Sequence, residues 1–271
     1  MAHPQQLQFI RTVSQHLSAD WTGKRILEIG SYDVNGSVRQ YFENSSYLGV
    51  DLTEGPGVDI VCESSELDQP DGAFDLCISC ECFEHNPKWL ETFLNMHRMT
   101  RKGGSVIFTC ATTGRLEHGT RRSFTRSSPG TQDSGWDYYL NLTERNFTRK
   151  VDMNQLFASY FFVTNTESRD LYFIGVTRGG EQIFRFDCQS LHKECIEVAE
   201  HSRRERIDAQ LRYPIVFRLL SRLCDLPVRL AMALPDRYYQ NFALSYCRIL
   251  EKFRESARYS VGKVLGVPRP R

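Results

Sequence analysis

Two acidic residues and a glycine stand at the ends of two predicted strands. Glu28 and Gly30 close the apolar segment that begins at Arg25, and Asp51 closes the segment that begins at Tyr47. Parallel strands bring their carboxyl ends to one edge of a sheet, so we expect these residues to border one ligand site. Glycine lets a ligand approach the backbone closely, and an aspartate can accept hydrogen bonds from both hydroxyls of a ribose. The pattern predicts a site for a ligand that contains a nucleoside.

The spacing around the glycine argues against a dinucleotide. A pyrophosphate is usually bound by Gly-x-Gly-x-x-Gly, but the residue two positions after Gly30 is Tyr32. The carboxylate of Glu28 would also repel a phosphate. S-adenosylmethionine carries an ammonium, a carboxylate and a sulfonium but no phosphate, and Glu28 suits this cation electrostatically. A helix predicted to begin after Asn35 and Gly36 offers free N–H groups to an anionic group.

The elements that position these residues alternate between short strands and helices. Strands are predicted over 25–30, 47–52, 58–62, 74–79 and 105–110, and helices over 5–18, 36–42, 87–99 and 151–160. This alternation is typical of βαβ units and of a parallel sheet that is covered on both faces. Two more strands, over 161–166 and 171–177, are close enough in sequence to predict an antiparallel hairpin that ends the sheet. Gly103 and Gly104 are expected to end the preceding helix.

Five segments, taken in order, resemble the motifs of class I S-adenosylmethionine-dependent methyltransferases. They are 27–31, which is similar to Glu/Asp-x-Gly-x-Gly, then Asp51, 58–63, 74–79 with Glu84 and His85 behind it, and 103–108. Tyr32 departs from the pattern, because it stands where the first motif usually has its second glycine. The resemblance covers about residues 20–180. It implies an α/β fold with a doubly wound, seven-stranded and mostly parallel sheet whose last strand is antiparallel.

The resemblance also implies a function and a set of contacts. It indicates a methyltransferase that takes S-adenosyl-L-methionine as its cofactor. In the third motif the acid faces the adenine amino group, which assigns that position to Glu63. The cofactor contacts that we expect are Glu28, Gly30, Ser31, Asp51, Leu52, Glu63, Ser64 and Cys80.

The acceptor side is predicted from residues that follow the fourth and fifth strands. His85 and His118 are candidates for the general base that a hydroxyl acceptor requires, although His85 is more often structural in similar families. His118 lies in an excursion over 111–146, whose length suggests an acceptor wall or lid. Arginines of the excursion could bind a phosphate or carboxylate, and its aromatic residues either line the acceptor pocket or hold the loop in place. These residues are Arg115, Arg121, Arg122 and Arg126, with Trp136, Tyr138 and Tyr139.

The cysteines predict neither a metal site nor a disulfide framework. Cys77 and Cys80 point to opposite faces of a strand, and no second ligand pair lies at metal spacing. The total of nine is odd and the spacing is irregular, which favours buried thiols in a reducing compartment. Residues 1–17 contain no apolar segment of the kind found in secretory signals, so we expect a cytoplasmic protein.

The distribution of charge divides the chain into two parts. Residues 1–189, the predicted methyltransferase domain, carry a net charge of −6, whereas residues 190–271 carry +7 and read as a basic extension of three or four helices. In the extension, apolar residues lie at helical spacing with arginines between them. This face either packs against the main domain or a second subunit, or attaches to an anionic membrane. The residues are Ile215, Val216, Leu219, Leu220 and Leu223, with Arg218 and Arg222.

Three functions remain open from the sequence. The favoured one is O-methylation of a small molecule such as a sugar, a glycolipid precursor or another secondary metabolite. The second is N-methylation of a nucleic acid or a protein. Many nucleic-acid enzymes of that kind carry Asp/Asn-Pro-Pro-Tyr/Phe where this chain has residues 80–83, and the acidic body disfavours a phosphate backbone as partner. The third is a scaffold without catalysis, against which the intact Glu28, Gly30 and Asp51 argue.

Overall fold

The computed structural model describes residues 3–265, which form two compact units divided between Tyr213 and Pro214. The first unit is built on a seven-stranded sheet with the strand order β3-β2-β1-β4-β5-β7-β6. Its strands are β1 Arg25–Ile29, β2 Ser46–Asp51, β3 Ile60–Val61, β4 Phe74–Cys80, β5 Thr100–Ala111, β6 Phe157–Asn165 and β7 Asp170–Thr177. Strands β1 to β5 pair in parallel, while β7 runs antiparallel to both β5 and β6. The predicted sheet and its terminal hairpin are confirmed.

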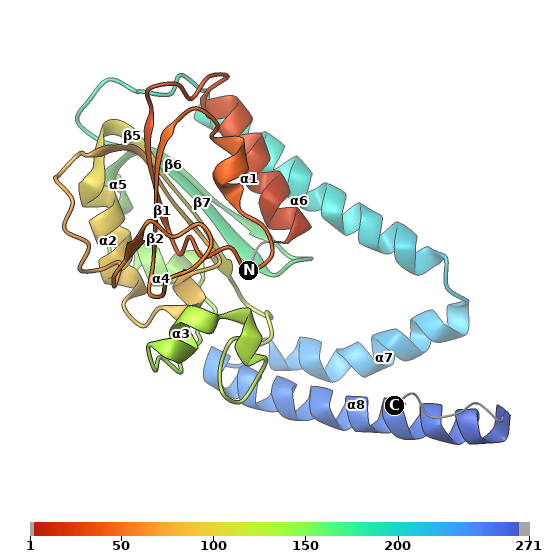
Figure 1. Ribbon diagram of the computed structural model, residues 1–271. Helices are drawn as coiled ribbons and strands as arrows, with labels where there is room; N and C mark the ends of the chain where they lie inside the picture. Colours follow the sequence, from red (N-terminus) through yellow and green to blue (C-terminus); the bar gives the residue numbers. More distant parts are fainter. Residues whose placement is uncertain (1–2, 266–271) are drawn as a thin grey trace. The chain divides into compact units, whose positions relative to one another are not determined.

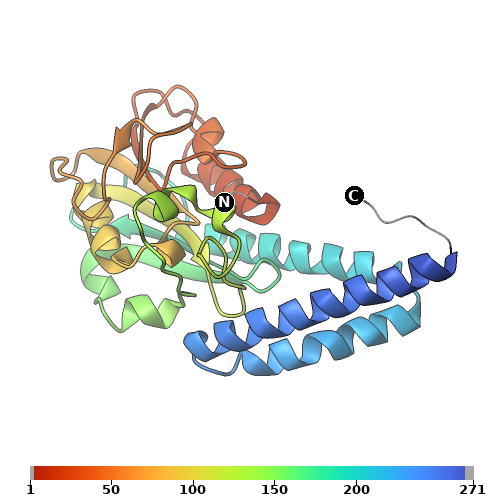
Figure 2. The ribbon, with the colours of Figure 1, turned by 60° about the horizontal axis from the view of Figure 1, so that its bottom comes forward.

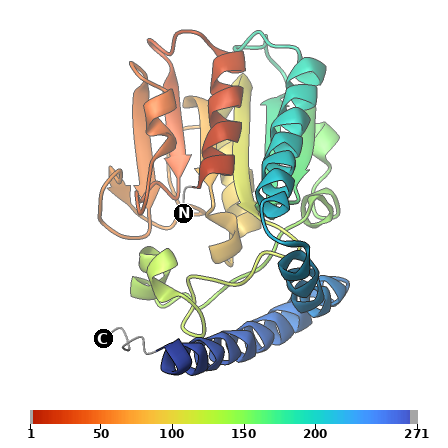
Figure 3. The same cartoon turned by 90° about the vertical axis from the view of Figure 1, so that its right-hand side faces the viewer.

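Helices cover both faces of this sheet. The helices of the first unit are α1 Pro4–Leu17, α2 Trp89–Met99, α3 Pro129–Asp133, α4 Glu144–Thr148, α5 Met153–Leu156 and α6 Cys188–Leu211. Short 3-10 turns are η1 Val38–Tyr41, η2 Phe83–His85 and η3 Thr125–Ser127. Helices α1 and α6 lie side by side on one face, and α2 covers the other (Figures 1 and 3).

The alternation of side chains along the strands supplies a core to each face. On β5, Phe108 enters the core beneath α2, whereas its neighbour Ile107 enters the core beneath α1 and α6. Period-two alternation requires this division. Both residues are fully buried, and the ring of Phe108 stacks on Phe147 and Phe173 at centroid distances of 4.7 and 4.9 Å. The sheet is therefore apolar on both sides, as a parallel sheet must be.

Four predicted elements are wrong in extent or type. Gly103 and Gly104 lie inside β5, where a Cβ on Gly104 would stand 2.6 Å from the carbonyl oxygen of Asp75, so close packing requires the glycine there. The helix predicted over 36–42 is only the short turn η1, and the third strand has two residues. The helix predicted over 151–160 ends at Leu156, because Phe157 begins a strand that buries its ring against Phe173.

The first part of the predicted basic extension belongs to the first unit. Helix α6 packs on α1 and β6, and its Leu191 and Cys195 are buried in the core beneath these elements. The second unit consists of α7 Ile215–Ala231 and α8 Asp236–Leu265, which run side by side (Figure 2). Ala231, Tyr239 and Ala243 form its small core. Among the described helices we find none whose length and apolar character would let it cross a bilayer.

Candidate functional site

A cleft opens at the carboxyl ends of β1, β2 and β4. It encloses about 880 Å³ of space, part of it open to solvent, which falls within the size range of small-molecule sites. Most of the residues that the sequence assigns to a cofactor line it together. These are Glu28, Gly30, Ser31, Asp51, Leu52, Ser64 and Cys80.

The turn after β1 closes without a second glycine. Gly30 has a φ of +77°, and a Cβ at this position would stand 2.7 Å from that of Cys82, so only glycine fits. The N–H of Gly30 donates to the carbonyl of Val50 at 2.8 Å, and the N–H of Tyr32 donates to Asp51 Oδ2 at 3.1 Å. The backbone of Tyr32 therefore ties the turn to the end of β2. This hydrogen bond fixes the backbone of the turn at the position where the first motif usually has its second glycine.

Asp51 is held rigidly at the tip of β2. Its Oδ1 accepts the N–H of Leu52 at 2.7 Å while its Oδ2 accepts that of Tyr32. Burial raises the pKa of this carboxyl, and the backbone N–H groups oppose that rise. A Cβ on Gly130 would lie 3.0 Å from Asp51 Oδ1, which shows how closely the excursion passes over this end of the cleft.

Glu28 faces the cleft from the end of β1 and is only 5% exposed. The hydroxyl of Tyr47 donates to its Oε2 at 2.8 Å. Burial raises the pKa of Glu28 to about 7, although the hydrogen bond from Tyr47 opposes the shift. The charge of this carboxylate therefore changes near neutral pH, and a cation beside it would favour the ionised form.

Residues that the sequence did not assign to the cofactor also line the cleft. Gln6, from α1, is one of them; it is fully buried, and neither of its amide atoms has a hydrogen-bond partner among the residues that the structure describes. From the excursion, residues 127–131 and Trp136 also line it. Gln6 was missed because it stands among apolar residues on a helix, where its pattern is that of an ordinary core face. A buried amide without a partner is suited to bind a ligand.

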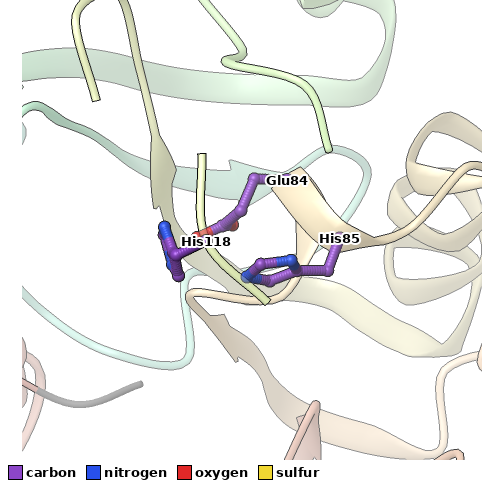
Figure 4. Close-up of side chains that lie close together, drawn as sticks. All are labelled: Glu84, His85 and His118. Atoms are coloured by element: carbon purple, nitrogen blue, oxygen red, sulfur yellow. The ribbon is translucent and has the colours of Figure 1, made fainter. Parts of the chain in front are cut away.

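The acceptor-side candidates gather where η2 meets the excursion (Figure 4). His85 lines the cleft, and the ring of His118 packs edge-on against it with centroids 4.9 Å apart. Glu84 lies beside both rings. Burial lowers the pKa of His85 well below its usual value and that of His118 to about 4, so both imidazoles are neutral at pH 7. Burial, and then the charge of Glu81, raise the pKa of Glu84 to about 8.

Comparison with known proteins agrees with this geometry. Residues 27–108, which run from β1 to β5, match the family model described as a methyltransferase domain. The match spans the glycine turn, the acid of β2 and the η2 residues. Residues 27–108 of the chain therefore belong to a methyltransferase domain. Comparison with curated proteins gives no match.

Solved structures similar to this methyltransferase are distant. Phosphoethanolamine N-methyltransferase 2 of Haemonchus contortus, in complex with S-adenosyl-L-methionine, shares 16% identity over 64% of this chain and 52% of its own, with a TM-score of 0.45. The 1,6-didemethyltoxoflavin N1-methyltransferase of Burkholderia thailandensis shares 17% over 63% and 79%, with a TM-score of 0.43. The chain thus spans about half the length of the Haemonchus enzyme.

One predicted cofactor residue lies outside the cleft of the methyltransferase. Glu63 is not among the lining residues, and its carboxylate is bound by Lys88 Nζ at 2.7 Å and by the hydroxyl of Ser65. Its neighbour Ser64 does line the cleft. Glu63 is thus one residue away from the wall of the cleft, and its carboxylate forms an ion pair with Lys88 instead.

The arginines of the excursion differ in their surroundings. Arg115 pairs with the buried Asp170 at 3.3 Å, and Arg122 donates to Glu117 at 2.8 Å, so both hold the excursion in place. Arg121 and Arg126 are exposed. Among the aromatic residues, Trp136 lines the cleft, whereas the ring of Tyr139 packs against His85 and His118.

Proposed function

We propose that this methyltransferase transfers the methyl group of S-adenosyl-L-methionine to a hydroxyl of a small molecule such as a sugar, a glycolipid precursor or another secondary metabolite. The observation that carries the proposal is a single cleft that is lined by two acids, Glu28 and Asp51, and also by His85. We assign the end lined by the two acids to the cofactor and the end lined by His85 to the acceptor, with the excursion as a wall of both.

The acidic end suits the cofactor. Asp51 holds its carboxylate on backbone N–H groups and can still accept hydrogen bonds from ribose hydroxyls, because each oxygen has two lone pairs. Glu28 offers a negative charge to the ammonium and sulfonium groups. Gly30, Ser31 and Leu52 supply backbone along the same wall. Glu28 is buried and Asp51 is half-buried, so water screens them less and their attraction for a cation is stronger.

The other end suits the acceptor. Methyl transfer is an in-line displacement in which the acceptor oxygen forms a bond to the methyl carbon as the carbon–sulfur bond breaks. The protein must hold the two reactants in line and exclude water. We propose that His85, supported by His118, activates the acceptor hydroxyl. Trp136 offers an aromatic face on which a sugar or an apolar ring can pack.

A small acceptor is favoured over a nucleic acid. Residues 1–213, the first compact unit, carry 23 lysines and arginines against 29 acids. A phosphate backbone would be repelled by that balance. Residues 127–131 and Trp136 also form part of the cleft wall, and an enclosed cleft suits a compact substrate better than a duplex.

Two measurements test the proposal. Isothermal titration with S-adenosylhomocysteine should show one site per chain. A cell extract split into small-molecule, RNA and protein fractions should then receive radioactive methyl groups from labelled cofactor chiefly in the first fraction, as an ether that resists mild base. Label confined to RNA or protein, or to an amine of a metabolite, would refute O-methylation of a small molecule. Absence of cofactor binding would refute the enzyme.

We further propose that the second unit binds the surface of an anionic membrane through α7. Its apolar residues form a continuous row at helical spacing, and all of them remain between 47% and 67% exposed. Arg218, Arg222 and Arg229 lie beside this row. Residues 214–271 carry 11 basic and 4 acidic residues, which complements anionic lipid. The row consists of Val216, Leu219, Leu220, Leu223, Leu226 and Leu230.

Sedimentation with vesicles tests this surface. The full chain should bind vesicles of phosphatidylglycerol and phosphatidylcholine far better than phosphatidylcholine alone. A Leu219→Glu/Leu223→Glu variant should stay in the supernatant, and Lys150→Gln, an exposed change in the first unit, should behave as the wild type. Equal binding to neutral vesicles, or a dimer in light scattering that the same leucine variant dissociates, would contradict the membrane proposal.

A further inference from the structure

Three side chains from distant parts of the sequence converge beside the cleft. Glu84 and His85 are neighbours in η2, directly after β4, and His118 comes from the excursion. One donor atom from each lies within 4.8 Å of the others. Figure 4 shows the Glu84 carboxylate and the His85 ring both directed toward His118. Ligands bind divalent ions at about 2.0–2.2 Å, so two ligands of one ion lie at most about 4.4 Å apart, and a small adjustment of these side chains brings the three donors to one ion.

The burial of this group leaves its donors without partners. Glu84 is 0% exposed and His85 is 4% exposed. Neither carboxylate oxygen of Glu84 and neither ring nitrogen of His85 has a hydrogen-bond partner in the described part of the chain. A buried polar group without a partner costs free energy, whether or not the carboxyl is ionised. A ligand that binds these atoms would recover that cost.

His118 is oriented as a metal-binding histidine is. Its Nδ1 lies 3.1 Å from the carbonyl oxygen of Leu116, and because a carbonyl only accepts, Nδ1 carries the proton. Nε2 is then left with a lone pair. Histidines that bind metals commonly donate their other ring nitrogen to a backbone carbonyl in this way. The ring of Tyr139 packs against both imidazoles and restricts their rotation.

A second cluster nearby serves as an internal comparison. His3, Glu81 and Asp170 also lie within 4.8 Å of one another. Here, however, His3 contacts Asp170 at 3.0 Å, and Arg115 contacts the same carboxylate at 3.3 Å. This cluster contains its own cations. Near Glu84, burial raises the pKa of the carboxyl and the charge of Arg115 lowers it, yet neither carboxylate oxygen of Glu84 has a hydrogen-bond partner among the described residues.

We propose that Glu84, His85 and His118 bind one divalent cation of the Mn²⁺, Fe²⁺ or Zn²⁺ class, which His85, as a residue of the cleft wall, would hold within reach of a bound acceptor. Two imidazoles and one carboxylate suit this class of ion better than Mg²⁺ or Ca²⁺. The sequence predicts no metal, because the third ligand is far from the other two along the chain and no metal spacing is visible.

The ion would explain how His85 activates the acceptor hydroxyl, namely as a ligand of the metal. This step rests on the function proposed above. The acceptor hydroxyl would bind the open position of the ion, which lowers the pKa of the hydroxyl. The oxygen then donates an electron pair to the methyl carbon while the carbon–sulfur bond breaks and its electrons stay on sulfur. The hydroxyl proton passes to water. The sulfonium charge is thus converted into one released proton, and both products are neutral at the reacting atoms.

Metal binding by the full chain, without an affinity tag, tests the site directly. Protein stripped with EDTA is dialysed against Mn²⁺, Zn²⁺ or Co²⁺ and analysed by elemental mass spectrometry. We expect about one ion per chain, and a Co²⁺ absorption spectrum with nitrogen ligands. His118→Ala and Glu84→Gln should each weaken binding by at least about tenfold. His201→Ala, an exposed histidine of α6, is the matched control and should bind as the wild type does.

The outcomes separate this inference from the proposed function. S-adenosylhomocysteine should bind the stripped protein and His118→Ala with nearly unchanged affinity, which shows that both are folded. If the cofactor binds but the wild type holds no stoichiometric ion, the metal site is refuted while the methyltransferase stands. If His118→Ala and Glu84→Gln retain the ion at wild-type affinity, the ion lies elsewhere and the assignment is wrong. If the cofactor does not bind at all, the proposed function fails first.

Discussion

The removal of the Asp51 carboxylate should weaken the binding of the cofactor more than any other single change in the cleft. In Asp51→Ala the ribose loses its charged acceptor, and the N–H groups of Tyr32 and Leu52 lose their partner. Hydrogen bonds to a charged group contribute about 1.5–3 kcal/mol each, and part of that loss is recovered by water. We therefore expect a loss of about 1–3 kcal/mol in binding. This corresponds to a dissociation constant weaker by about 5- to 150-fold.

Two further variants make this prediction specific. Asp51→Asn keeps one oxygen acceptor and the size of the side chain, so its loss should be smaller than that of the alanine variant. Asp71→Ala removes an 81% exposed carboxylate whose partner is Arg98, and it should leave the cofactor affinity unchanged. Titration calorimetry with S-adenosylhomocysteine measures all three, and thermal unfolding confirms that each is folded. Wild-type affinity in a folded Asp51→Ala variant would refute the assignment.

Three other perturbations probe the rest of the account. Because the pKa of Glu28 is raised to about 7, its carboxylate becomes protonated at lower pH, and the affinity for the cofactor should fall by up to tenfold per pH unit below pH 7. Glu28→Gln should flatten this pH dependence. An unchanged slope in that variant would exclude Glu28 as the titrating group. Gly119→Ala would bring a Cβ to 2.8 Å from His85 Cε1, at a backbone φ of +71°, so methyl transfer should slow by about tenfold while the Kd for S-adenosylhomocysteine stays within about twofold. Phe108→Ala should lower the free energy of unfolding by about 3–5 kcal/mol in urea titrations, since the ring is fully buried; a loss below about 1 kcal/mol would contradict the packing described.

Local patterns predicted the cofactor end of the cleft. Glu28, Gly30 and Asp51 each follow a short apolar strand, and the order of strands in this fold places those strand ends together. Seven of the eight predicted cofactor residues line the same cleft. These residues come together because strand, turn and acid are contiguous in the sequence, and their contact with the cofactor stays a prediction. The exception, Glu63, depends on the exact end of the two-residue strand β3, where periodicity is weak.

Residues that depend on tertiary contacts could not be predicted. Gln6 reaches the cleft only because α1 packs beneath the strand ends, and nothing in its neighbourhood distinguishes it. The pairing of Glu84 with His118 requires the path of the excursion, which has no periodicity. The boundary between the two units is similar: α6 is basic and helical like the segments after it, but Leu191 and Cys195 attach it to the sheet.

At β5 and β6, tertiary packing determines the structure more strongly than the local helix signals on which the prediction rested. Gly103 and Gly104 read as a helix terminator, yet the strand needs them because Glu181 and Asp75 approach the backbone too closely for a side chain. At β6, the helix predicted over 151–160 ends early, because Phe157 packs against the aromatic core as part of a strand. Close approach and ring packing are properties of the folded chain, and a single sequence does not display them.

The structure of the complex with S-adenosylhomocysteine is the most direct test of the central claim. The account predicts both ribose hydroxyls within hydrogen-bond distance of the Asp51 carboxylate, with the amino-acid end of the ligand turned toward Glu28 and Gln6. The sulfur should then point toward His85. A ligand that occupies another part of the surface, or that lies in this cleft without contact to either acid, would contradict the account.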